Sequence, residues 1–354
     1  MKTSLFRLAA IGISAAALAV AAPVATGNAD VKSAGPLAFG PNGVLFIGDS
    51  IGAKIVAVDT GDTKAGASAA VNISGIDAKI AAALGTSADQ ISIRDLATNP
   101  VSKNVYISVS RGKGTDAAFV LLKLDTAGKL SEVRLDNVKF SSESLPNPTA
   151  STRASDKLDT ITEIRYVDGK ILVAGLSNEE FSSNMRSIPY PFANVDKGAS
   201  IEMYHGSHGR YETNSPIRTF VPYTIGNQQY ILAAYTCTPL VKIPVSQLKG
   251  GAKVTGSTIA EMGAGNRPLD MVAYKKDGKD YILMANSAHG VTKLDAAHLE
   301  TYKSITAPSE IAGVPFQTLD NFKGVRHLQA YDEKSALMLM DDNGGLALKT
   351  VALP

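Results

Sequence analysis

Apolar strands separated by polar turns recur six times along the chain, and this pattern predicts the fold. Each copy begins with a short apolar strand and passes through a turn rich in Asn, Asp, Gly or Pro. A second apolar strand follows and ends in small polar residues. Such turns between β-rich runs are strong hairpin signals. The six first strands are centred on Leu37, Leu96, Ile164, Phe220, Met271 and Leu328.

The first and second strands are apolar on both faces, which is typical of strands packed between neighbouring sheets. Third strands follow in most copies, and outer strands are expected at residues 70–73, 131–135, 255–260 and 302–305. We therefore predict an all-β protein, a six-bladed β-propeller with four-stranded blades. The sixth copy has no fourth strand of its own, so we expect Asp30–Ala34, the N-terminal strand of the mature chain, to close the ring.

Three segments interrupt the repeat. Asp77–Leu84 is rich in alanine and predicts a short helix, whereas Ser141–Asp159 reads as a polar loop. Gly175–Gly209 is expected to be a long loop inserted in the third copy. Loops on a rigid scaffold often carry function, so this insertion is a candidate surface for a partner protein.

Residues 1–29 have the pattern of a secretory signal peptide. Lys2 and Arg7 precede the apolar run Leu8–Ala22, and small residues follow up to a cleavage site after Ala29, with an earlier cut after Ala21 as the alternative. The run is shorter than a membrane span requires. We therefore predict a single propeller domain over residues 30–354, located in the periplasm or secreted, with no membrane insertion after signal cleavage.

Composition excludes several classes of function. Lys and Arg number 35 and Asp and Glu number 33, with no basic stripe, so nucleic acid is not an expected partner. Cys237 is the single cysteine, so the sequence allows no internal disulfide and no Cys-x-x-Cys-His haem attachment. No nucleotide-binding motif is present either.

The opening repeat Gly35-Pro-Leu-Ala-Phe-Gly-Pro-Asn-Gly-Val-Leu-Phe-Ile-Gly-Asp-Ser50 resembles blades of six-bladed propellers of the NHL and SMP-30/gluconolactonase/strictosidine-synthase-like families. The resemblance covers about residues 35 to 352 and concerns architecture. It implies a divalent metal, often calcium, on the propeller axis. The Glu-Gly-Pro opening of the lactonase-type families is matched only in part, as Ala34-Gly35-Pro36.

Aligning the six copies predicts which residues meet at the axis. The position that enters the innermost strand is occupied by Pro36, Asp95, Glu163, Thr219, Asp270 and His327. Three carboxylates crowded beside one imidazole repel one another and should not all stay ionised without a partner. A divalent metal, calcium first, would do so with Asp95, Glu163, Asp270 and His327 as ligands. The alternative is pairing with the neighbouring Arg94, Arg218, Arg267 and Arg326, which are also candidate ligand-binding residues.

The loops after the second strands bring further candidates to the same face. Asn286 is a candidate ligand-binding residue, and Cys237 and His289 could hold zinc or copper in place of calcium. Buried free cysteines are more often small apolar residues. His205 and His208 form a local pair that we expect to lie in a solvated loop.

These features lead to three functional hypotheses. The first is an exported binding or interaction propeller, with a small molecule or a cell-envelope protein as partner. The second is a divalent-metal-dependent hydrolase of the lactonase or esterase type. The third is a copper-linked oxidoreductase accessory. Candidate catalytic residues for the last two are His327, His289 and Cys237.

Overall fold

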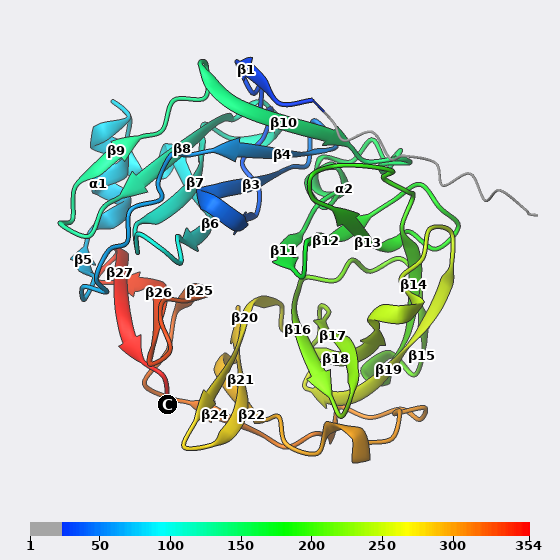
Figure 1. Ribbon diagram of the computed structural model, residues 1–354. Helices are drawn as coiled ribbons and strands as arrows, with labels where there is room; N and C mark the ends of the chain where they lie inside the picture. Colours follow the sequence, from blue (N-terminus) through cyan, green and yellow to red (C-terminus); the bar gives the residue numbers. More distant parts are fainter. Residues whose placement is uncertain (1–22) are drawn as a thin grey trace, which may run out of the picture.

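A computed structural model describes residues 23–354, and strands account for most of its regular structure. The strands form a ring of antiparallel sheets around a central axis, as in a β-propeller (Figure 1). Within residues 23–354 we distinguish six groups of strands, numbered by the position of their innermost strand along the chain. The described residues form two α-helices, α1 (Ile76–Ala83) and α2 (Ala154–Leu158), both in connections, and α1 confirms the helix predicted from the alanine-rich segment.

The first group contains β2 (Leu37–Phe39), β3 (Val44–Asp49), β4 (Lys54–Asp59) and β10 (Val138–Ser144), with β1 (Ala25–Gly27) outside β10. The second contains β6 (Ile91–Thr98), β7 (Val105–Arg111), β8 (Ala118–Leu124) and β9 (Leu130–Glu132). The third contains β11 (Glu163–Val167), β12 (Lys170–Leu176), β13 (Ser183–Pro189) and β14 (Ala199–His205), and β15 (Arg210–Glu212) pairs with β14.

The fourth group contains β16 (Thr219–Ile225), β17 (Gln228–Ala234), β18 (Pro239–Pro244) and β19 (Lys253–Met262), and β23 (Ile311–Gly313) pairs with β19. The fifth contains β20 (Pro268–Lys276), β21 (Lys279–Asn286), β22 (Gly290–Asp295) and β24 (Phe316–Leu319). The sixth contains β25 (Val325–Ala330), β26 (Ser335–Asp342), β27 (Gly345–Ala352) and β5 (Asn72–Ser74). A parallel pairing of β14 with β19 joins the third and fourth groups at their outer edge.

The groups do not follow one another around the ring in chain order. The innermost strand β2 contacts β6 on one side and β11 on the other, and β6 contacts β25. The order around the axis is therefore second, first, third, fourth, fifth and sixth group, after which the ring returns to the second (Figure 1). The chain leaves the first group after β4, builds the second group, and returns with β10 to complete the first.

Hydrophobic packing supports the same order independently. Most buried apolar side chains of the described residues fall into six clusters, and each cluster lies between two groups that are neighbours in the ring. Leu37 of the first group packs with Tyr106 of the second, for example, and Leu96 of the second packs with Leu337 of the sixth. Because each sheet buries both faces this way, the ring is held by apolar packing on every side.

The closure predicted through Asp30–Ala34 is wrong. The outer strand of the sixth group is β5, and Asn72, Ile73 and Ser74 pair with Lys349, Leu348 and Ala347 of β27. The sequence could not reveal this pairing, because an outer strand at residues 70–73 fits the first or the sixth group equally well by pattern. The strand predicted at residues 302–305 is also absent, and β24 takes the outer position of the fifth group.

The long loop predicted at Gly175–Gly209 is another correction, since this segment contains β13 and β14. Its strands were hidden because polar side chains are buried in β13: Asn184 and Arg186 are each 0% exposed. Such polar residues are typical of a solvent-exposed loop, but this strand is paired with β12 along its whole length. Likewise, the loop predicted at Ser141–Asp159 begins inside β10 and contains α2.

The predicted signal sequence lies largely in residues 1–22, outside the described residues. The remainder of it is ordered: β1 pairs with β10, and Ala29 is buried and donates its backbone N–H to the Leu135 carbonyl at 2.9 Å. Cleavage after Ala29 would remove these contacts, whereas cleavage after Ala21 would keep them. Neither helix within residues 23–354 has the length and hydropathy of a transmembrane span.

The ring order predicts a specific cross-link. Asn72 and Lys349 are directly opposed in an antiparallel pair, where Cα atoms lie at about 4.5–5.5 Å, within the range that a disulfide spans. In a Cys237→Ser background, we expect the Asn72→Cys, Lys349→Cys pair to oxidise to a disulfide, measured by free-thiol titration and peptide mass spectrometry. The matched pair Lys32→Cys, Lys349→Cys should remain reduced. A disulfide in the second pair but not the first would contradict this ring order.

Candidate functional site: an axial cavity with an arginine rim

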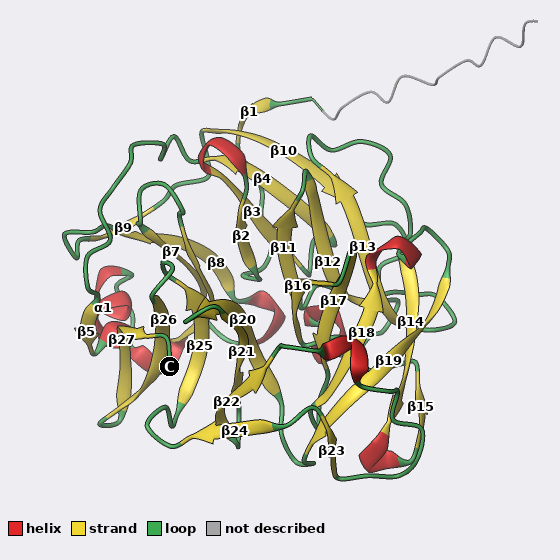
Figure 2. Cartoon of the chain, turned by 60° about the horizontal axis from the view of Figure 1, so that its bottom comes forward, coloured by secondary structure: helices red, strands yellow, loops and turns green. Residues whose placement is uncertain are grey.

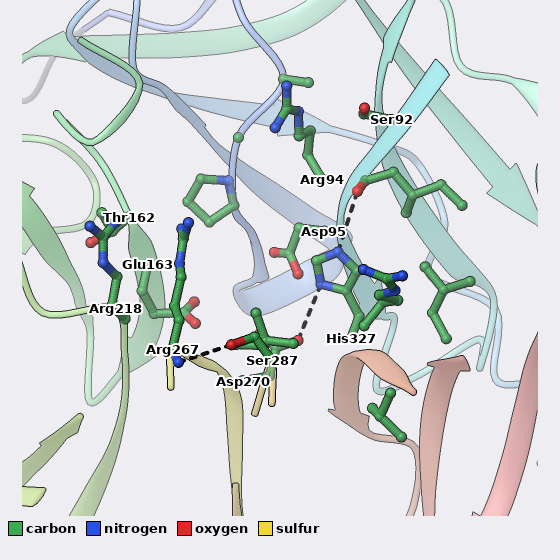
Figure 3. Close-up of a pocket in the computed structure, with 18 of the residues that line it drawn as sticks. Ser92, Arg94, Asp95, Thr162, Glu163, Arg218, Arg267, Asp270, Ser287 and His327 are labelled. Atoms are coloured by element: carbon green, nitrogen blue, oxygen red, sulfur yellow. Dashed lines mark hydrogen bonds and ion pairs between the residues drawn. The ribbon is translucent and has the colours of Figure 1, made fainter. Parts of the chain in front are cut away.

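A cavity of about 690 Å³ opens where the chain enters the innermost strands. Its lining includes Asp95 on β6, Glu163 on β11, Asp270 on β20 and His327 on β25, so four groups contribute one charged side chain each. Figure 3 shows these four side chains gathered around one centre. The predicted convergence of residues that are far apart in sequence is therefore observed.

Three of these strands carry a β-bulge at the same place. The pairing register shifts between Ile93 and Asp95 in β6, between Pro268 and Asp270 in β20, and between Val325 and His327 in β25. The extra residues are Arg94, Leu269 and Arg326. A bulge leaves one residue unpaired and redirects its neighbours. As a result, consecutive residues such as Arg94 and Asp95 both face the cavity instead of alternating between opposite faces.

The carboxylates join neighbouring innermost strands in pairs. Asp95 accepts the Leu37 N–H at 2.6 Å, which links the second group to the first. Glu163 accepts the Thr219 hydroxyl at 3.2 Å, and Asp270 accepts the Leu328 N–H at 2.9 Å. These bonds link the third group to the fourth and the fifth to the sixth. Each carboxylate is therefore part of the framework as well as of the cavity.

His327 is fixed in its charged form by its two partners. Its Nδ1 lies 3.1 Å from Asp270 Oδ2 and its Nε2 lies 3.3 Å from the Ile93 carbonyl oxygen. Both partners only accept hydrogen bonds, so both ring nitrogens must donate. Burial alone would lower the pKa of His327, but the bond to Asp270 and the charges of Asp270 and Asp95 outweigh it and raise the pKa to about 9. The ring is an imidazolium at neutral pH.

Burial has the opposite effect on the two carboxyl groups beside it. Burial, with the nearby Asp270 charge, raises the pKa of Asp95 to about 6, although His327 offsets part of the shift. Burial raises the pKa of Glu163 to about 8, against the opposing charge of Arg165. The groups interact strongly enough to titrate as one cluster. Burial and the neighbouring carboxyl charges therefore both oppose ionisation of Asp95 and Glu163.

The sequence did not single out Arg165, whose positive charge offsets the negative charge of the axial carboxyl groups. Its guanidinium lies 3.3 Å from Glu163 Oε2 and 3.4 Å from the Met271 carbonyl oxygen, and it does not line the cavity. Residues two apart on a strand point to the same face. The spacing of Glu163 and Arg165 on a predicted innermost strand therefore indicates that both side chains lie on the same face of the strand.

Of the predicted metal ligands, His327 is not arranged to bind a metal here. One ligand atom each from Asp95, Asp270 and His327 lies within 4.8 Å of the others. However, both nitrogens of His327 carry protons, and both oxygens of Asp95 already accept backbone N–H groups, from Leu37 and Leu96. Arg165 and His327 supply the positive charge that a metal would otherwise bring. The geometry therefore favours a hydrogen-bonded ion cluster, and an axial metal stays a prediction.

The four predicted arginines surround the cavity without pairing with the axial carboxylates. Arg218 forms an ion pair with Asp159 at 2.8 Å and Arg326 pairs with Asp341 at 2.9 Å. Arg94 donates to the Ser110 hydroxyl at 3.1 Å, and among the described residues neither Arg94 nor Arg267 has a carboxylate partner. Partial removal from water and the nearby Arg218 and Arg94 charges lower the pKa of Arg267. Figure 3 shows Arg94, Arg218 and Arg267 around the carboxylates.

The remaining predicted site residues lie elsewhere. Asn286 is buried and bonds to Asn266 and to the Met284 carbonyl, and it lines a smaller cavity of about 460 Å³ together with His289. Neither residue lines the axial cavity, although Ser287 between them does. Cys237 does not line it either; it lies beside His205 and His208.

Comparison with known proteins identifies no family for this chain. No family model matches the sequence, and no curated protein matches it. The NHL and SMP-30 resemblance therefore stays a prediction. Several solved structures are similar over nearly the whole chain. The putative oxidoreductase (glucose dehydrogenase) of Thermus thermophilus is 12% identical, over 93% of this chain and 100% of that chain, with a TM-score of 0.38.

The PQQ-bound aldose sugar dehydrogenase of Streptomyces coelicolor is 12% identical over 93% of this chain and 98% of that chain, with a TM-score of 0.35. The soluble aldose sugar dehydrogenase of Escherichia coli, in its apo form, is 12% identical over 94% and 99%, with a TM-score of 0.34. At these identities and TM-scores, the similarity carries no argument about activity, substrate or cofactor.

The protonation of His327 predicts a pH-dependent stability. Because the folded-state pKa is about 9 and the ordinary value 6.5, its contribution is complete below pH 6.5 and is lost as the pH rises through 9. The raised pKa values of Asp95, from 3.8 to about 6, and of Glu163, from 4.5 to about 8, also lower the free energy of unfolding as the pH rises, but mostly at lower pH than His327 does. We expect the free energy of unfolding to fall over this range, and His327→Gln to remove on the order of 2 kcal/mol of that fall.

Chemical denaturation at a series of pH values measures this effect. His298→Gln is the matched control, because the His298 side chain is 80% exposed. It should leave the pH profile of the unfolding free energy unchanged. An identical profile for His327→Gln and the unmodified chain would show that His327 is not a buried imidazolium.

Proposed function

We propose that this protein is an exported binding protein that holds a small anionic molecule in the axial cavity of a six-bladed β-propeller, whose blades are the six groups of strands. The observation that carries the proposal is the arginine rim. Arg94, Arg218, Arg267 and Arg326 come from four different groups and line one cavity. A volume of about 690 Å³ suits a small-molecule ligand.

The charge of the rim favours an anion. Asp159 and Asp341 compensate Arg218 and Arg326, which leaves the guanidinium groups of Arg94 and Arg267 for a ligand. Planar guanidinium groups bind carboxylate and phosphate through paired hydrogen bonds. The lowered pKa of Arg267, which reflects partial burial and its cationic neighbours, is the electrostatic signature of a site that an anion would stabilise.

The floor of the cavity supports binding rather than catalysis. A general base needs an available lone pair, and His327 has none while it donates to Asp270 and Ile93. The other two candidate catalytic residues, His289 and Cys237, do not line the cavity. Since the carboxylates are engaged in bonds between neighbouring strands, the arginines are the groups left to meet a ligand.

The lactonase or esterase hypothesis makes a different prediction. A calcium ion on Asp95 and Asp270 would polarise an ester carbonyl, and it would first have to displace the His327 proton network. Calcium-dependent hydrolysis of a simple lactone, abolished in Asp270→Asn, would establish that function in place of simple binding.

The arginine rim predicts a selective loss of anion binding. We expect inorganic phosphate or citrate to bind the purified chain, and Arg267→Gln to weaken that binding by about 10-fold or more. One charge-assisted hydrogen bond is worth about 1.5–3 kcal/mol, which corresponds to this change. Isothermal titration calorimetry at low salt measures the affinity.

Lys303→Gln is the control with the same change of charge at an exposed position outside the cavity lining. It should bind phosphate and citrate as the unmodified chain does. Equal weakening in both variants would point to non-specific attraction, and the absence of binding to either anion would contradict the proposed ligand class.

A further inference from the structure

A second cluster of reactive side chains lies at the outer edge of the third and fourth groups. His205 ends β14, His208 belongs to the short 3₁₀ turn Gly206–His208 that follows, and Cys237 lies in the loop between β17 and β18. One ring nitrogen of each histidine and Cys237 Sγ lie within 4.8 Å of one another. The strands β14, β15, β18 and β19 that carry or flank the cluster lie together on one side of the molecule (Figure 2). None of the three residues lines the axial cavity.

Glu212 on β15 orients both histidines. Its carboxylate oxygens lie 3.0 Å from His205 Nδ1 and 2.6 Å from His208 Nδ1, and Arg210 Nε is 3.5 Å away. A carboxylate oxygen accepts hydrogen bonds, so both Nδ1 atoms donate to Glu212. The nitrogen that remains for another partner is therefore Nε2 on each ring.

Several buried polar atoms around the turn Gly206–His208 have no partner among the described residues. His205 is 2% exposed and its Nε2 makes no hydrogen bond, and the Ser207 hydroxyl is also unpartnered. Glu261, 0% exposed, accepts the Gly206 N–H through one oxygen while its other oxygen has no partner. Buried polar groups are nearly always satisfied in folded proteins, so this concentration indicates a bound group.

The cysteine is held in a strained backbone. Cys237 and Thr238 both have positive φ, at 63° and 61°, a conformation that is costly for a β-branched residue such as threonine. The conformation is held by the Cys237 N–H donating to the Asn266 carbonyl at 2.6 Å and by the Thr238 hydroxyl donating to the Gly263 carbonyl at 2.8 Å. Strain of this kind is commonly retained where it positions a functional group.

We propose that His205, His208 and Cys237 bind one thiophilic transition-metal ion, copper or zinc, through the two Nε2 atoms and the thiolate. Two imidazoles and a thiolate are a donor set for both metals. A carboxylate that receives the other N–H of a ligating histidine is the usual supporting arrangement, and Glu212 supplies it to both rings. His208 is 43% exposed, which gives an ion a route to the buried His205.

Metal binding also accounts for which atoms of the cluster carry protons. The ion replaces the proton of the Cys237 thiol, which passes to solvent, while both Nδ1 protons stay on the histidines. Protonating His205 Nε2 instead would leave a buried donor without an acceptor. The cluster is thus arranged to present two imidazole lone pairs and one sulfur, with no oxidant or second reactant required.

The test uses the full chain, stripped with a chelator and titrated separately with Zn²⁺ and, under anaerobic reducing conditions, with Cu⁺. Each titration competes with a chromophoric chelator, so that the two arms identify the preferred metal. Co²⁺ serves as a spectroscopic substitute for zinc. We expect one ion per chain and a thiolate-to-cobalt charge-transfer band. Cys237→Ser should abolish the band, and His208→Gln should weaken binding by at least about 10-fold.

Glu212→Gln tests the positioning role separately. It keeps all three ligands, so we expect the charge-transfer band to persist while the affinity falls by about 10- to 100-fold. His289→Gln and His298→Gln are the controls and should bind the ion as the unmodified chain does, with circular dichroism confirming that every variant is folded.

Three results would overturn the proposal: no ion bound at one per chain in either arm, binding that survives in both Cys237→Ser and His208→Gln, or binding that is lost only in Asp270→Asn. The last result would place the ion on the axis. The anion site is tested by Arg267→Gln, which should leave metal binding unchanged, so failure of one proposal does not imply failure of the other.

Discussion

The structure depends on burying charge at the centre of the ring. A carboxylate removed from water is unfavourable unless hydrogen bonds and opposite charge compensate it. Asp95, Glu163 and Asp270 obtain that compensation from the adjacent innermost strand, and each bond joins a different pair of groups. The buried carboxyl groups are therefore compensated only when these neighbouring groups pack against each other. Apolar packing between neighbouring groups brings the strands together, and the carboxylates fix which strands meet at the axis.

The bulges connect this framework to the cavity. Regular strands would alternate their side chains, so an arginine next to an inward carboxylate would point away from it. The extra residue in β6 and in β25 lets Arg94 and Arg326 line the same cavity as Asp95 and His327. The carboxylates and His327 then compensate one another's charge, and the arginines line the cavity around them. The cavity therefore combines a floor of mutually compensating charges with a rim of arginines.

The sequence predicted the positions of the strands along the chain far better than the order of the groups around the ring. The first strands centred on Leu37, Leu96 and Leu328 are innermost strands in the structure, because runs that are apolar on both faces have few other places to go. Which group lies beside which is a different question. Nothing in a repeat indicates that β6 packs between β25 and β2, since that order depends on β5 and β10 crossing between groups. The polar strand β13 was missed for a related reason: the burial of Arg186 comes from tertiary packing, which hydropathy does not record.

The two candidate sites show why hydrogen-bond accounting separates cases that composition does not. Both contain histidine beside acidic residues, and alignment favoured the axial set as the metal centre. At the axis, His327 has no free ring nitrogen, and both oxygens of Asp95 already accept backbone N–H groups. At the outer edge, His205 keeps a buried nitrogen without a partner, and a sulfur lies close by. Sequence could not bring Cys237 to that pair, because their proximity depends on the parallel pairing of β14 with β19 across two groups. A metal is expected where lone pairs remain unsatisfied, and that criterion selects the site that the pattern of residues had placed in solvent.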